Sequence, residues 1–268
     1  MERVRTQDAV ALPAQLTHQR INLPCIVCII VALFCCIKDR AAHAGSVSRA
    51  FTDALFSPET WIPLGASVAS YASGADRKIS DWATENTPIF GGITDARTAS
   101  DNISGLLFIS TYTTAAIHHS TQQKYSLSTG LTFDTLAIGV NAYQTDNFKR
   151  WTDRKRPLSP ESDESFLSGH SSNAHVMGTL SAIHMRHIFR NDPYYSDIAS
   201  ASAYVASGAV AWARVEGGRH YPSDVLAGAA LGNFIANFAN NLLQSDAHAR
   251  FGVFQDSDGW KVLTRWEF

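Results

Sequence analysis

The sequence predicts an all-α protein, a bundle of about six or more helices. Three observations support this fold class. Apolar residues recur with the 3.6-residue period of amphipathic helices, strand-like alternation is scarce, and clusters of turn-forming residues separate the helical blocks. The chain has 268 residues, 45% hydrophobic and 17% charged, which suits one globular domain with a substantial core.

Six helical blocks follow one another along the chain. They cover residues 61–73, 104–119, 130–148, 171–190, 200–214 and 224–243. Three turn clusters lie between them, SGADRK at 73–78, SPESDES at 159–165 and RNDPYYSD at 190–197. These clusters are rich in the small and polar residues that favour turns. Short connections make successive helices antiparallel, so we expect neighbouring blocks to run up and down.

The last block shows the clearest helical pattern. Its apolar stripe consists of Leu231, Phe234, Ile235, Phe238 and Leu242. This spacing places all five side chains on one face of a helix. Gly228 and Gly232 lie in the same block and lack the Cβ atom that would hold a neighbour away. The sequence therefore predicts a close helix contact at these two glycines.

Residues 1–44 are predicted to stand apart from the bundle. Three arginines precede an uncharged run at 21–37, and small residues follow it at Ala42 and Ala44. This order is typical of a secretory signal peptide, here cleaved before Gly45. An uncleaved membrane anchor is the alternative, because the leader before the run is long and charged residues follow the run directly.

Residues 45–268 are then expected to form a single exported domain, soluble and periplasmic, with membrane association left open. All four cysteines lie at 21–37, where they fit small apolar residues of a hydrophobic helix better than a zinc site. The remainder needs no disulfide, which is compatible with an oxidising compartment. Residues 1–44 hold five of the 22 Lys and Arg and three of the 24 Asp and Glu, which leaves a net charge of −4 and predicts no nucleic-acid partner.

Basic residues gather in the stretch KRWTDRKRP at 149–157. A basic cluster at a helix end is often only solvated and favoured by the helix dipole. Further along, LSGHSSNAH places Ser168, Gly169 and His170 just before a helical block. A helix start offers unpaired N–H groups, and glycine allows close backbone approach. Together the two segments predict an anion site.

A third segment, ARVEGGRHYPSDVLAG, carries Arg214, His220 and Asp224. Asp224 lies in the first turn of the last helix, well placed to hold one ring nitrogen of His220. The other nitrogen would then point outward as a nucleophile or base. Because successive helices run antiparallel, all three segments fall at the same end of the bundle. We therefore expect the active site there.

In type and order these residues resemble the three-part signature of the type 2 phosphatidic acid phosphatase superfamily, which includes bacterial class A acid phosphatases and vanadium haloperoxidases. The matching residues are Lys149, Arg156 and Pro157, then Ser168, Gly169 and His170, then Arg214, His220 and Asp224. The resemblance covers residues 149–224. Leu167 and Ala213 depart from the pattern, since the family usually has proline and serine there.

The resemblance implies a phosphate cradle. Lys149, Arg156 and Arg214 would bind the phosphate oxygens, and Ser168 and the Gly169 amide would complete the site. Planar guanidinium groups suit this task because they neutralise the charge on the equatorial oxygens. Side-chain cations thus replace a divalent metal, and we expect neither a metal nor any other cofactor.

The resemblance also implies the chemistry. His220 would be the nucleophile that forms a phosphohistidine, and His170 the general acid that protonates the leaving group. Asp224 would orient His220. The sequence therefore predicts a metal-independent phosphatase that hydrolyses phosphate monoesters or diphosphates, of lipids or of small soluble esters. Envelope lipid phosphates are favoured, because the family has periplasmic members, and peripheral membrane contact would fit such a substrate.

Two other functions remain open. A vanadium-dependent haloperoxidase would use the same cradle, although those enzymes tend to be longer. A non-catalytic protein that binds phosphate or lipid would need the three cations but not two histidines, so His170 and His220 argue against it.

Polar residues outside the signature are expected to play smaller parts. Arg150, Arg154 and Lys155 fit a charged rim or solvated helix-end positions, and Glu216 fits a partner of one arginine. Three further histidines, His175, His184 and His187, are expected at surface or capping positions. His118 and His119 end an apolar helix, where the helix dipole favours a cation.

Overall fold

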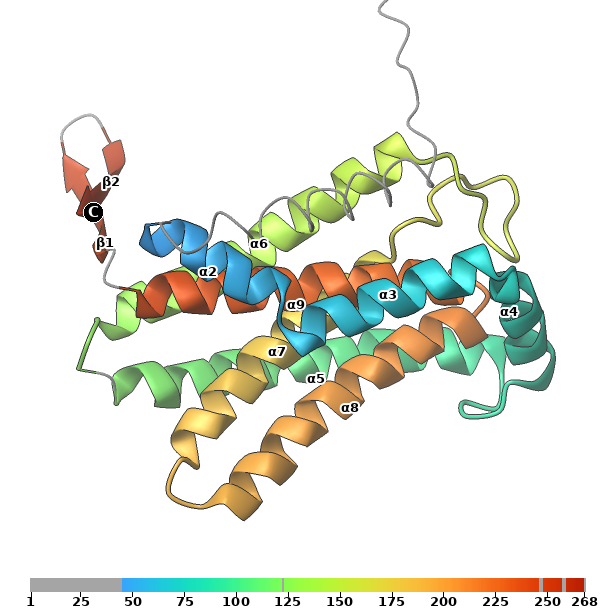
Figure 1. Cartoon of the computed structure of the whole chain (residues 1–268), viewed down its shortest axis with the longest axis horizontal. Coiled ribbons are helices and arrows are strands. Elements are labelled where there is room, and N and C mark those ends of the chain that lie inside the picture. Colours follow the sequence, from blue (N-terminus) through green and yellow to red (C-terminus); the bar gives the residue numbers. More distant parts are fainter. Residues whose placement is uncertain (1–44, 122, 246–247, 257–258, 268) are drawn as a thin grey trace, which may run out of the picture.

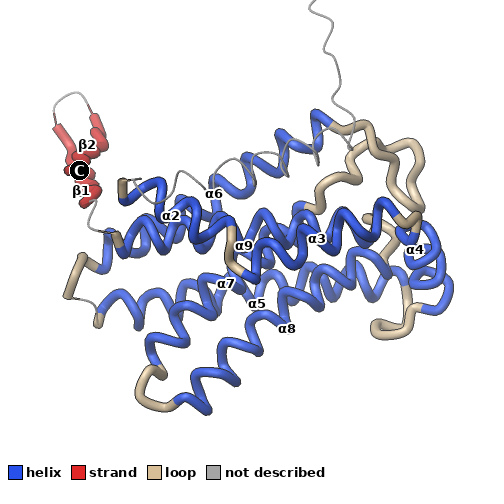
Figure 2. The backbone as a smooth tube through the Cα atoms, in the orientation of Figure 1, coloured by secondary structure: helices blue, strands red, loops and turns tan. Residues whose placement is uncertain are grey.

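The computed structural model describes residues 45–121, 123–245, 248–256 and 259–267. Helices make up most of this part of the chain (Figure 2). They are α2 (Ser46–Leu55), α3 (Pro58–Ala72), α4 (Ala75–Asn86), α5 (Ile93–Ser120), α6 (Leu127–Trp151), α7 (Gly169–Ile188), α8 (Pro193–Glu216) and α9 (Pro222–Gln244). The predicted signal peptide or anchor at 1–44, with its cysteines, lies outside the described residues.

The helices form the predicted bundle (Figure 1). Two helices occupy its middle: α7 packs against α5, α6, α8 and α9, and α9 packs in addition against α2 and α3. The main hydrophobic core lies between these helices and contains Leu107, Ala137, Ala174, Val176, Met177, Leu180, Val210, Ile235 and Ala236. The all-α fold class predicted from the helical periodicity is therefore confirmed.

The close contact predicted at two glycines of α9 is also confirmed. A Cβ atom on Gly228 would lie 2.7 Å from the carbonyl oxygen of Ser168, and one on Gly232 would lie 2.3 Å from that of Ser172. Both distances are too short for a real Cβ, so only glycine lets the first turns of α7 approach α9 this closely. This contact places the N-terminal end of α7 directly beside α9.

Two helices are missing from the sequence prediction, α2 and α4. The cluster SGADRK at 73–78 was expected to be a turn, but only Ser73 and Gly74 lie outside a helix there. Gly74 adopts the left-handed conformation with a φ of 70°, and α4 begins directly after it. The polar Asp76 in its first turn is buried. The helix was missed because the polar cluster at its start was interpreted as a turn, although Ala83 in its later part packs against Val215 and Val225.

A two-stranded antiparallel hairpin follows α9 and was not predicted either. Its strands are β1 (His248–Asp256) and β2 (Gly259–Glu267), and His248 pairs with Glu267 in the register. The hairpin lies beyond the C-terminal end of α9 (Figure 1). It adds a small β-element to a helical bundle without changing the fold class.

The prediction of a surface or capping position is wrong for His184. Its side chain is buried in α7, and His118 and His119 are buried at the end of α5. A polar neighbour explains the burial, because Asp134 of α6 lies 2.8 Å from Nε2 of His119 and 3.3 Å from Nε2 of His184. Buried imidazoles need such partners.

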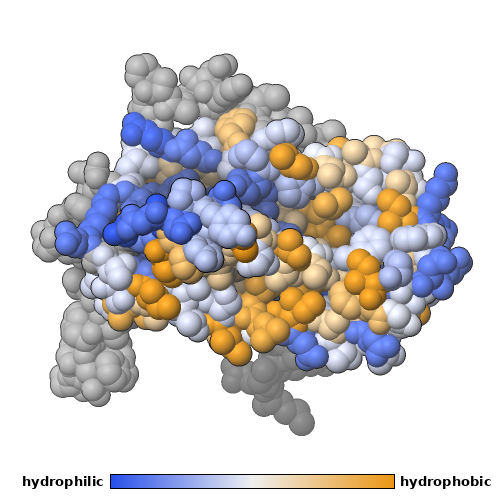
Figure 3. All heavy atoms as spheres, turned by 90° about the horizontal axis from the view of Figure 1, so that it is seen from below, coloured by the Kyte–Doolittle hydropathy of each residue, from blue (hydrophilic) through white to orange (hydrophobic). Residues whose placement is uncertain are grey.

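Apolar side chains also reach the surface. Seen from below, they gather over much of one face of the molecule (Figure 3). The exposed large apolar side chains include Leu106, Phe108 and Ile109 of α5, and Ile198 and Val205 of α8. A large exposed apolar patch marks a site of contact with protein or membrane more often than a plain solvated surface.

Candidate active site

The structure brings the three predicted site segments to one end of the bundle. The first segment begins in the last turn of α6 and continues into the loop after it, the second begins α7, and the third joins the end of α8 to the start of α9 (Figure 1). This arrangement follows from the antiparallel course of the helices, as the short connections predicted. Backbone contacts then fix the segments to one another.

The second and third segments are joined by hydrogen bonds between α7 and α9. The amide of Ser168 donates to the carbonyl oxygen of Asp224 at 3.1 Å, and the hydroxyl of Ser171 donates to that of Val225 at 2.6 Å. Ser168 also caps α7, because its Oγ accepts from the amide of Ser171. The first turn of α7, with Gly169 and His170, is thereby held against the start of α9.

The first and third segments meet at the turn between α8 and α9. The amide of Leu158 donates to the carbonyl oxygen of Gly218 at 3.2 Å. Gly218 has a φ of 65°, and a Cβ atom there would lie 2.3 Å from Cδ1 of Leu158. Only glycine fits this position. The contact holds Arg156, two residues before Leu158, near the loop that carries His220.

The cations of the three segments all influence the protonation of His220. The positive charges of Arg214, Arg156 and Lys149 each help to lower the pKa of His220, after the larger effect of its burial. Lys149 also lies close to the start of α7, since a Cβ atom on Gly169 would be 3.7 Å from its Nζ. Three cations therefore surround one imidazole.

Two of these cations have an unsatisfied donor. The described residues contain three buried side-chain N or O atoms without a hydrogen-bond partner: Nε of Arg156, Nε of Arg214 and Oγ of Ser80. Other guanidinium nitrogens are paired, with Glu164 for Arg156 at 3.3 Å and with Ser100 for Arg214 at 3.2 Å. A buried N–H without an acceptor costs free energy, which an anion between the two arginines would recover.

Burial also disfavours the protonated form of Arg214. Burial, opposed by Asp101 and assisted by the charges of Arg219, Arg156 and Arg97, lowers the pKa of Arg214 to about 10. The guanidinium group is still charged at neutral pH. A cluster of like charges that each disfavour the others is a site that favours an anion.

His220 is held in one tautomer. Its Nδ1 lies 2.7 Å from the carbonyl oxygen of Ser165, which can only accept, so Nδ1 carries the proton. Nε2 is then unprotonated in the neutral ring. Burial and the charge of Arg214 hold the pKa of His220 well below its usual value, so the ring is neutral at neutral pH. A bare Nε2 in a cationic site can serve as a nucleophile.

The expected contact between Asp224 and His220 needs correction. Asp224 instead accepts hydrogen bonds from the guanidinium group of Arg154, from the hydroxyl of Ser165 at 2.6 Å and from the amide of Tyr221 at 2.8 Å. Its carboxylate turns back to cap its own helix, and this takes it away from the imidazole. Asp224 therefore acts on His220 through Ser165, whose carbonyl group holds Nδ1.

Arg154 is a second correction, because the expected rim residue is largely buried. Its guanidinium group lies between the carboxylates of Asp224 and Asp76 and over the ring of Tyr221, 4.4 Å from the centroid. Asp76 also accepts from the amide of Ser223 at 2.9 Å. Burial alone would raise the pKa of Asp76, but the hydrogen bonds from Ser223 and Arg154 lower it below its usual value. This network fixes the start of α9.

Burial raises the pKa of Asp224 to about 6, although the charge of Arg154 and the hydroxyl of Ser165 act in the opposite direction. At neutral pH the carboxylate is ionised and paired with Arg154. The pair therefore joins the loop after α6 to the first turn of α9.

His170 has a partner that the sequence gave no means to find. Its Nε2 lies 3.0 Å from Oδ1 of Asp101, in the part of α5 that precedes the predicted block. Burial and the charge of Arg214 lower the pKa of His170, while Asp101 raises it. Glu216 also differs from expectation, because it accepts from the backbone amides of Ile89 and Phe90 instead of pairing with an arginine.

An apolar cavity of about 170 Å³ lies behind the site. Phe148, Phe166 and Leu167 line it, and each stands next to or near a predicted phosphate-binding residue in the sequence. The other lining residues are Leu55, Thr60, Leu64, Ser67, Val68, Ala227, Ala230, Leu231 and Phe234. A wall of this composition accepts hydrocarbon rather than water.

Comparison with known proteins supports the resemblance seen in the sequence. The model of the PAP2 superfamily matches residues 107–246. The fold is similar to the crystal structure of the first transmembrane PAP2 type phosphatidylglycerolphosphate phosphatase from Bacillus subtilis, with a TM-score of 0.50 and 20% identity over 80% of this chain and 94% of that chain. No curated protein matches the chain.

The same comparison contradicts the predicted exported, periplasmic location. The solved structure that shares the fold is that of a transmembrane phosphatase. Within the described ranges of this chain, none of the helices is both long enough and apolar enough to cross a bilayer. The prediction relied on residues 1–44 and on the composition of the remainder, and neither of these determines the location of a fold that is also found within membranes.

Proposed function

The chain belongs to the PAP2 superfamily, which includes phosphatases, and on that premise we propose that it is a metal-independent phosphatase that hydrolyses lipid phosphate monoesters or diphosphates through a phosphohistidine at His220. The observation that carries the proposal is the pair of buried Nε donors without acceptors, on Arg156 and Arg214. The charges of both arginines act on the neutral imidazole of His220, and a phosphate group bound between them would satisfy both donors.

Binding would use the cations first. Arg156, Arg214 and Lys149 hold the non-bridging oxygens, and the amide of Gly169 at the start of α7 donates to one of them, with Ser168 beside it. Since the positive charges are already in place, they stabilise the negative charge of the transition state without reorganisation. This is the work that a divalent metal does in other phosphatases.

The chemistry would then proceed in two steps. Nε2 of His220 attacks the phosphorus atom, the bond to the leaving oxygen breaks, and His170 gives its proton to that oxygen. In the second step a water molecule gives a proton to His170 and attacks the phosphohistidine, so that the N–P bond breaks and inorganic phosphate leaves. Asp224 and Ser165 act as positioning residues, because they keep the proton of His220 on Nδ1.

Two features favour a lipid over a small soluble ester. The apolar cavity lined by Phe148, Phe166 and Leu167 reaches residues adjacent to the cradle and could hold part of a hydrocarbon chain. The apolar surface of Figure 3 would suit contact with a bilayer or a detergent micelle. We therefore place phosphorylated lipids ahead of soluble phosphate esters as substrates.

The test is phosphate release from a matched set of substrates. Phosphatidic acid, phosphatidylglycerol phosphate and a prenyl diphosphate in detergent micelles are compared with a soluble aryl phosphate, each with and without EDTA. We expect the lipids to give the higher kcat/KM and EDTA to leave the initial rates unchanged below the unfolding temperature. Loss of activity with the fold intact would contradict the metal-independent mechanism, and a preference for the aryl ester would contradict the lipid substrate.

The pH dependence of the reaction follows from His170. As a general acid it must be protonated in the free enzyme, and burial together with Arg214 lowers its pKa from the usual value of 6.5. We expect kcat/KM to be highest on the acidic side of neutrality and to fall about tenfold for each pH unit above the pKa of His170.

Asp101 provides the matched variant for this pH profile. Its charge raises the pKa of His170, so Asp101→Asn should move the fall in kcat/KM to lower pH. The measurement is phosphate release from acidic to alkaline pH for the wild type and for Asp101→Asn. An alkaline optimum, or a profile that Asp101→Asn leaves in place, would remove His170 from the role of general acid.

A further inference from the structure

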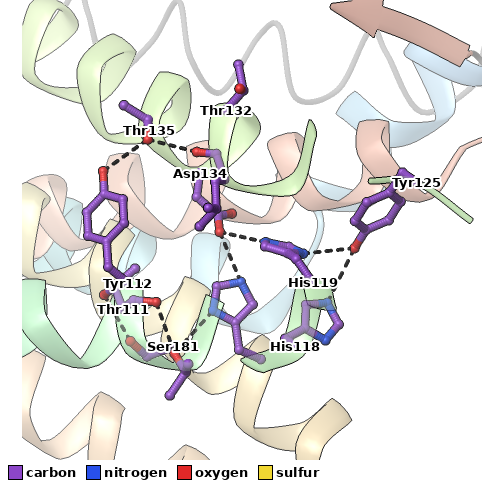
Figure 4. A network of polar contacts seen from close by, with 12 residues as sticks. Thr111, Tyr112, His118, His119, Tyr125, Thr132, Asp134, Thr135 and Ser181 are labelled. Carbon is purple, nitrogen blue, oxygen red and sulfur yellow. Dashed lines mark hydrogen bonds and ion pairs between the residues drawn. The ribbon is translucent and has the colours of Figure 1, made fainter. Parts of the chain in front are cut away.

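A second cluster of buried polar residues lies at the end of the bundle opposite the active site. It combines His118 and His119 at the end of α5, Tyr125 just before α6, and Asp134 in α6 (Figure 4). His184, near the end of α7, completes the cluster. His184 follows His170 on α7 by about 20 Å along the helix axis. No step of the proposed phosphatase mechanism uses this cluster.

Three atoms of the cluster have the arrangement of metal ligands. Oδ2 of Asp134 lies 2.8 Å from Nε2 of His119 and 3.3 Å from Nε2 of His184, and the three atoms all lie within 4.8 Å of one another. The side chains are no more than 5% exposed. In a tetrahedral site with bonds of about 2.1 Å, neighbouring ligand atoms are about 3.4 Å apart, so little movement is needed to admit an ion.

Proton positions give the strongest argument. The hydroxyl of Thr114 can donate its one proton to the carbonyl oxygen of Ser110 at 2.8 Å or to that of Thr111 at 3.1 Å, so it accepts from Nδ1 of His184 at 3.3 Å. A neutral His184 then has a bare Nε2, which faces a carboxylate oxygen of Asp134. Two lone pairs in this position repel each other unless a proton or a metal ion lies between them.

His119 has the same arrangement. Its Nδ1 lies 3.2 Å from the hydroxyl oxygen of Tyr125, which can accept the ring proton. The Tyr125 hydroxyl can in turn donate to Nε2 of His118 at 3.4 Å. In this tautomer Nε2 of His119 is unprotonated and faces Oδ2 of Asp134 at 2.8 Å, where a metal ion would take the place of the ring proton. A hydrogen bond from the far ring nitrogen to an oxygen is what holds a metal-binding imidazole in position.

The backbone of α6 is shaped around this cluster. A Cβ atom on Gly130 would lie 2.3 Å from Cγ of His119, so a glycine is required where the ring packs against the helix. Gly130 lies one turn before Asp134. The glycine therefore makes room for the imidazole on the face of α6 that carries the carboxylate.

We propose that His119, Asp134 and His184 bind one divalent ion of the zinc class through Nε2, Oδ2 and Nε2, and that the ion joins α5, α6 and α7 at this end of the bundle. Two imidazoles and one carboxylate suit zinc, and three protein ligands leave one position for water. The role is structural, because the site is remote from the phosphate cradle. The proposal does not rest on the proposed phosphatase function.

The test uses the full-length protein purified without chelators. Metal content is measured by mass spectrometry before and after dialysis against zinc alone, and cobalt is exchanged in for its visible absorption. We expect one equivalent of zinc, a tetrahedral cobalt spectrum, and a Tm that falls on EDTA treatment and returns with zinc. A wild-type protein that binds neither ion stoichiometrically would overturn the proposal and would leave the cluster as a hydrogen-bonded His and Asp network.

Variants locate the ion. Asp134→Asn and His184→Ala should lose the bound metal, and Gly130→Ala should weaken binding although it removes no ligand. His175→Gln is the matched control, because His175 lies on the same helix with Nδ1 bonded to the carbonyl oxygen of Ser171, and it should keep the metal. Metal retained by Asp134→Asn and His184→Ala would overturn the proposal. Phosphate release below the unfolding temperature should not change in any of these variants, which separates this test from that of the phosphatase.

Discussion

Replacing His220 with alanine should reduce kcat for phosphate release by a factor on the order of 10⁴ or more. The reason lies in the mechanism, since the variant has no Nε2 to form the phosphohistidine, and water would have to attack the phosphate directly. Binding should be less affected, because the cations that hold the phosphate do not change. The measurement is the steady-state rate of phosphate release with the preferred lipid substrate.

His220→Asn is the matched variant, because its side-chain amide can still donate to the carbonyl oxygen of Ser165, the group that now accepts from Nδ1. Both variants should keep the helical circular dichroism spectrum. Asparagine should restore most of any stability that alanine loses, but none of the activity. Substantial turnover by His220→Asn would show that His220 is not the nucleophile. A wild-type protein that binds a phosphorylated substrate without hydrolysing it would favour the non-catalytic alternative.

Replacing Arg154 with methionine should lower the free energy of unfolding by about 3–5 kcal/mol. The guanidinium group pairs with Asp76 and Asp224, whose side chains are no more than 8% exposed. Methionine has a similar length but no charge, so two carboxylates would be left buried without their cation. The measurement is chemical denaturation followed by circular dichroism at neutral pH.

Lys155→Met provides the control, because Lys155 is adjacent in the sequence and exposed. Its effect should stay within about 0.5 kcal/mol. Adding Asp76→Asn to Arg154→Met should recover part of the loss, because it removes one of the two uncompensated charges. An Arg154→Met protein as stable as the wild type would mean that the network does not hold α9 in place.

Local sequence patterns predicted six of the eight helices in the described part of the chain, and missed α2 and α4. The stripe from Leu231 to Leu242 predicted α9, and Gly228 and Gly232 predicted its close neighbour. The prediction failed at α4, because the polar cluster SGADRK at its start was interpreted as a turn. The local sequence does not reveal that Asp76 in this cluster is buried and bonded to Ser70, Arg154 and Ser223.

The candidate site was likewise predicted only in part. Its cations and histidines belong to a motif with fixed spacings, and the structure brings them to one end of the bundle. The contacts of Asp101, Arg154 and Ser165 were not predicted, because each reaches motif residues that are distant in the sequence. The contact of Asp224 was predicted from its distance of four residues to His220, but its carboxylate caps the helix instead. The spacing of the motif residues predicted that they lie close together, but it could not predict which groups the carboxylate of Asp224 binds.

Capture of the covalent intermediate tests directly whether His220 is the nucleophile. Wild-type protein is mixed with substrate, stopped with alkali within a turnover, digested and analysed by mass spectrometry. The account predicts a phosphoryl group on Nε2 of His220 that is lost in acid and is not formed by His220→Asn. A phosphoryl group on another residue, or turnover of the wild type without any phosphorylated peptide, would contradict it.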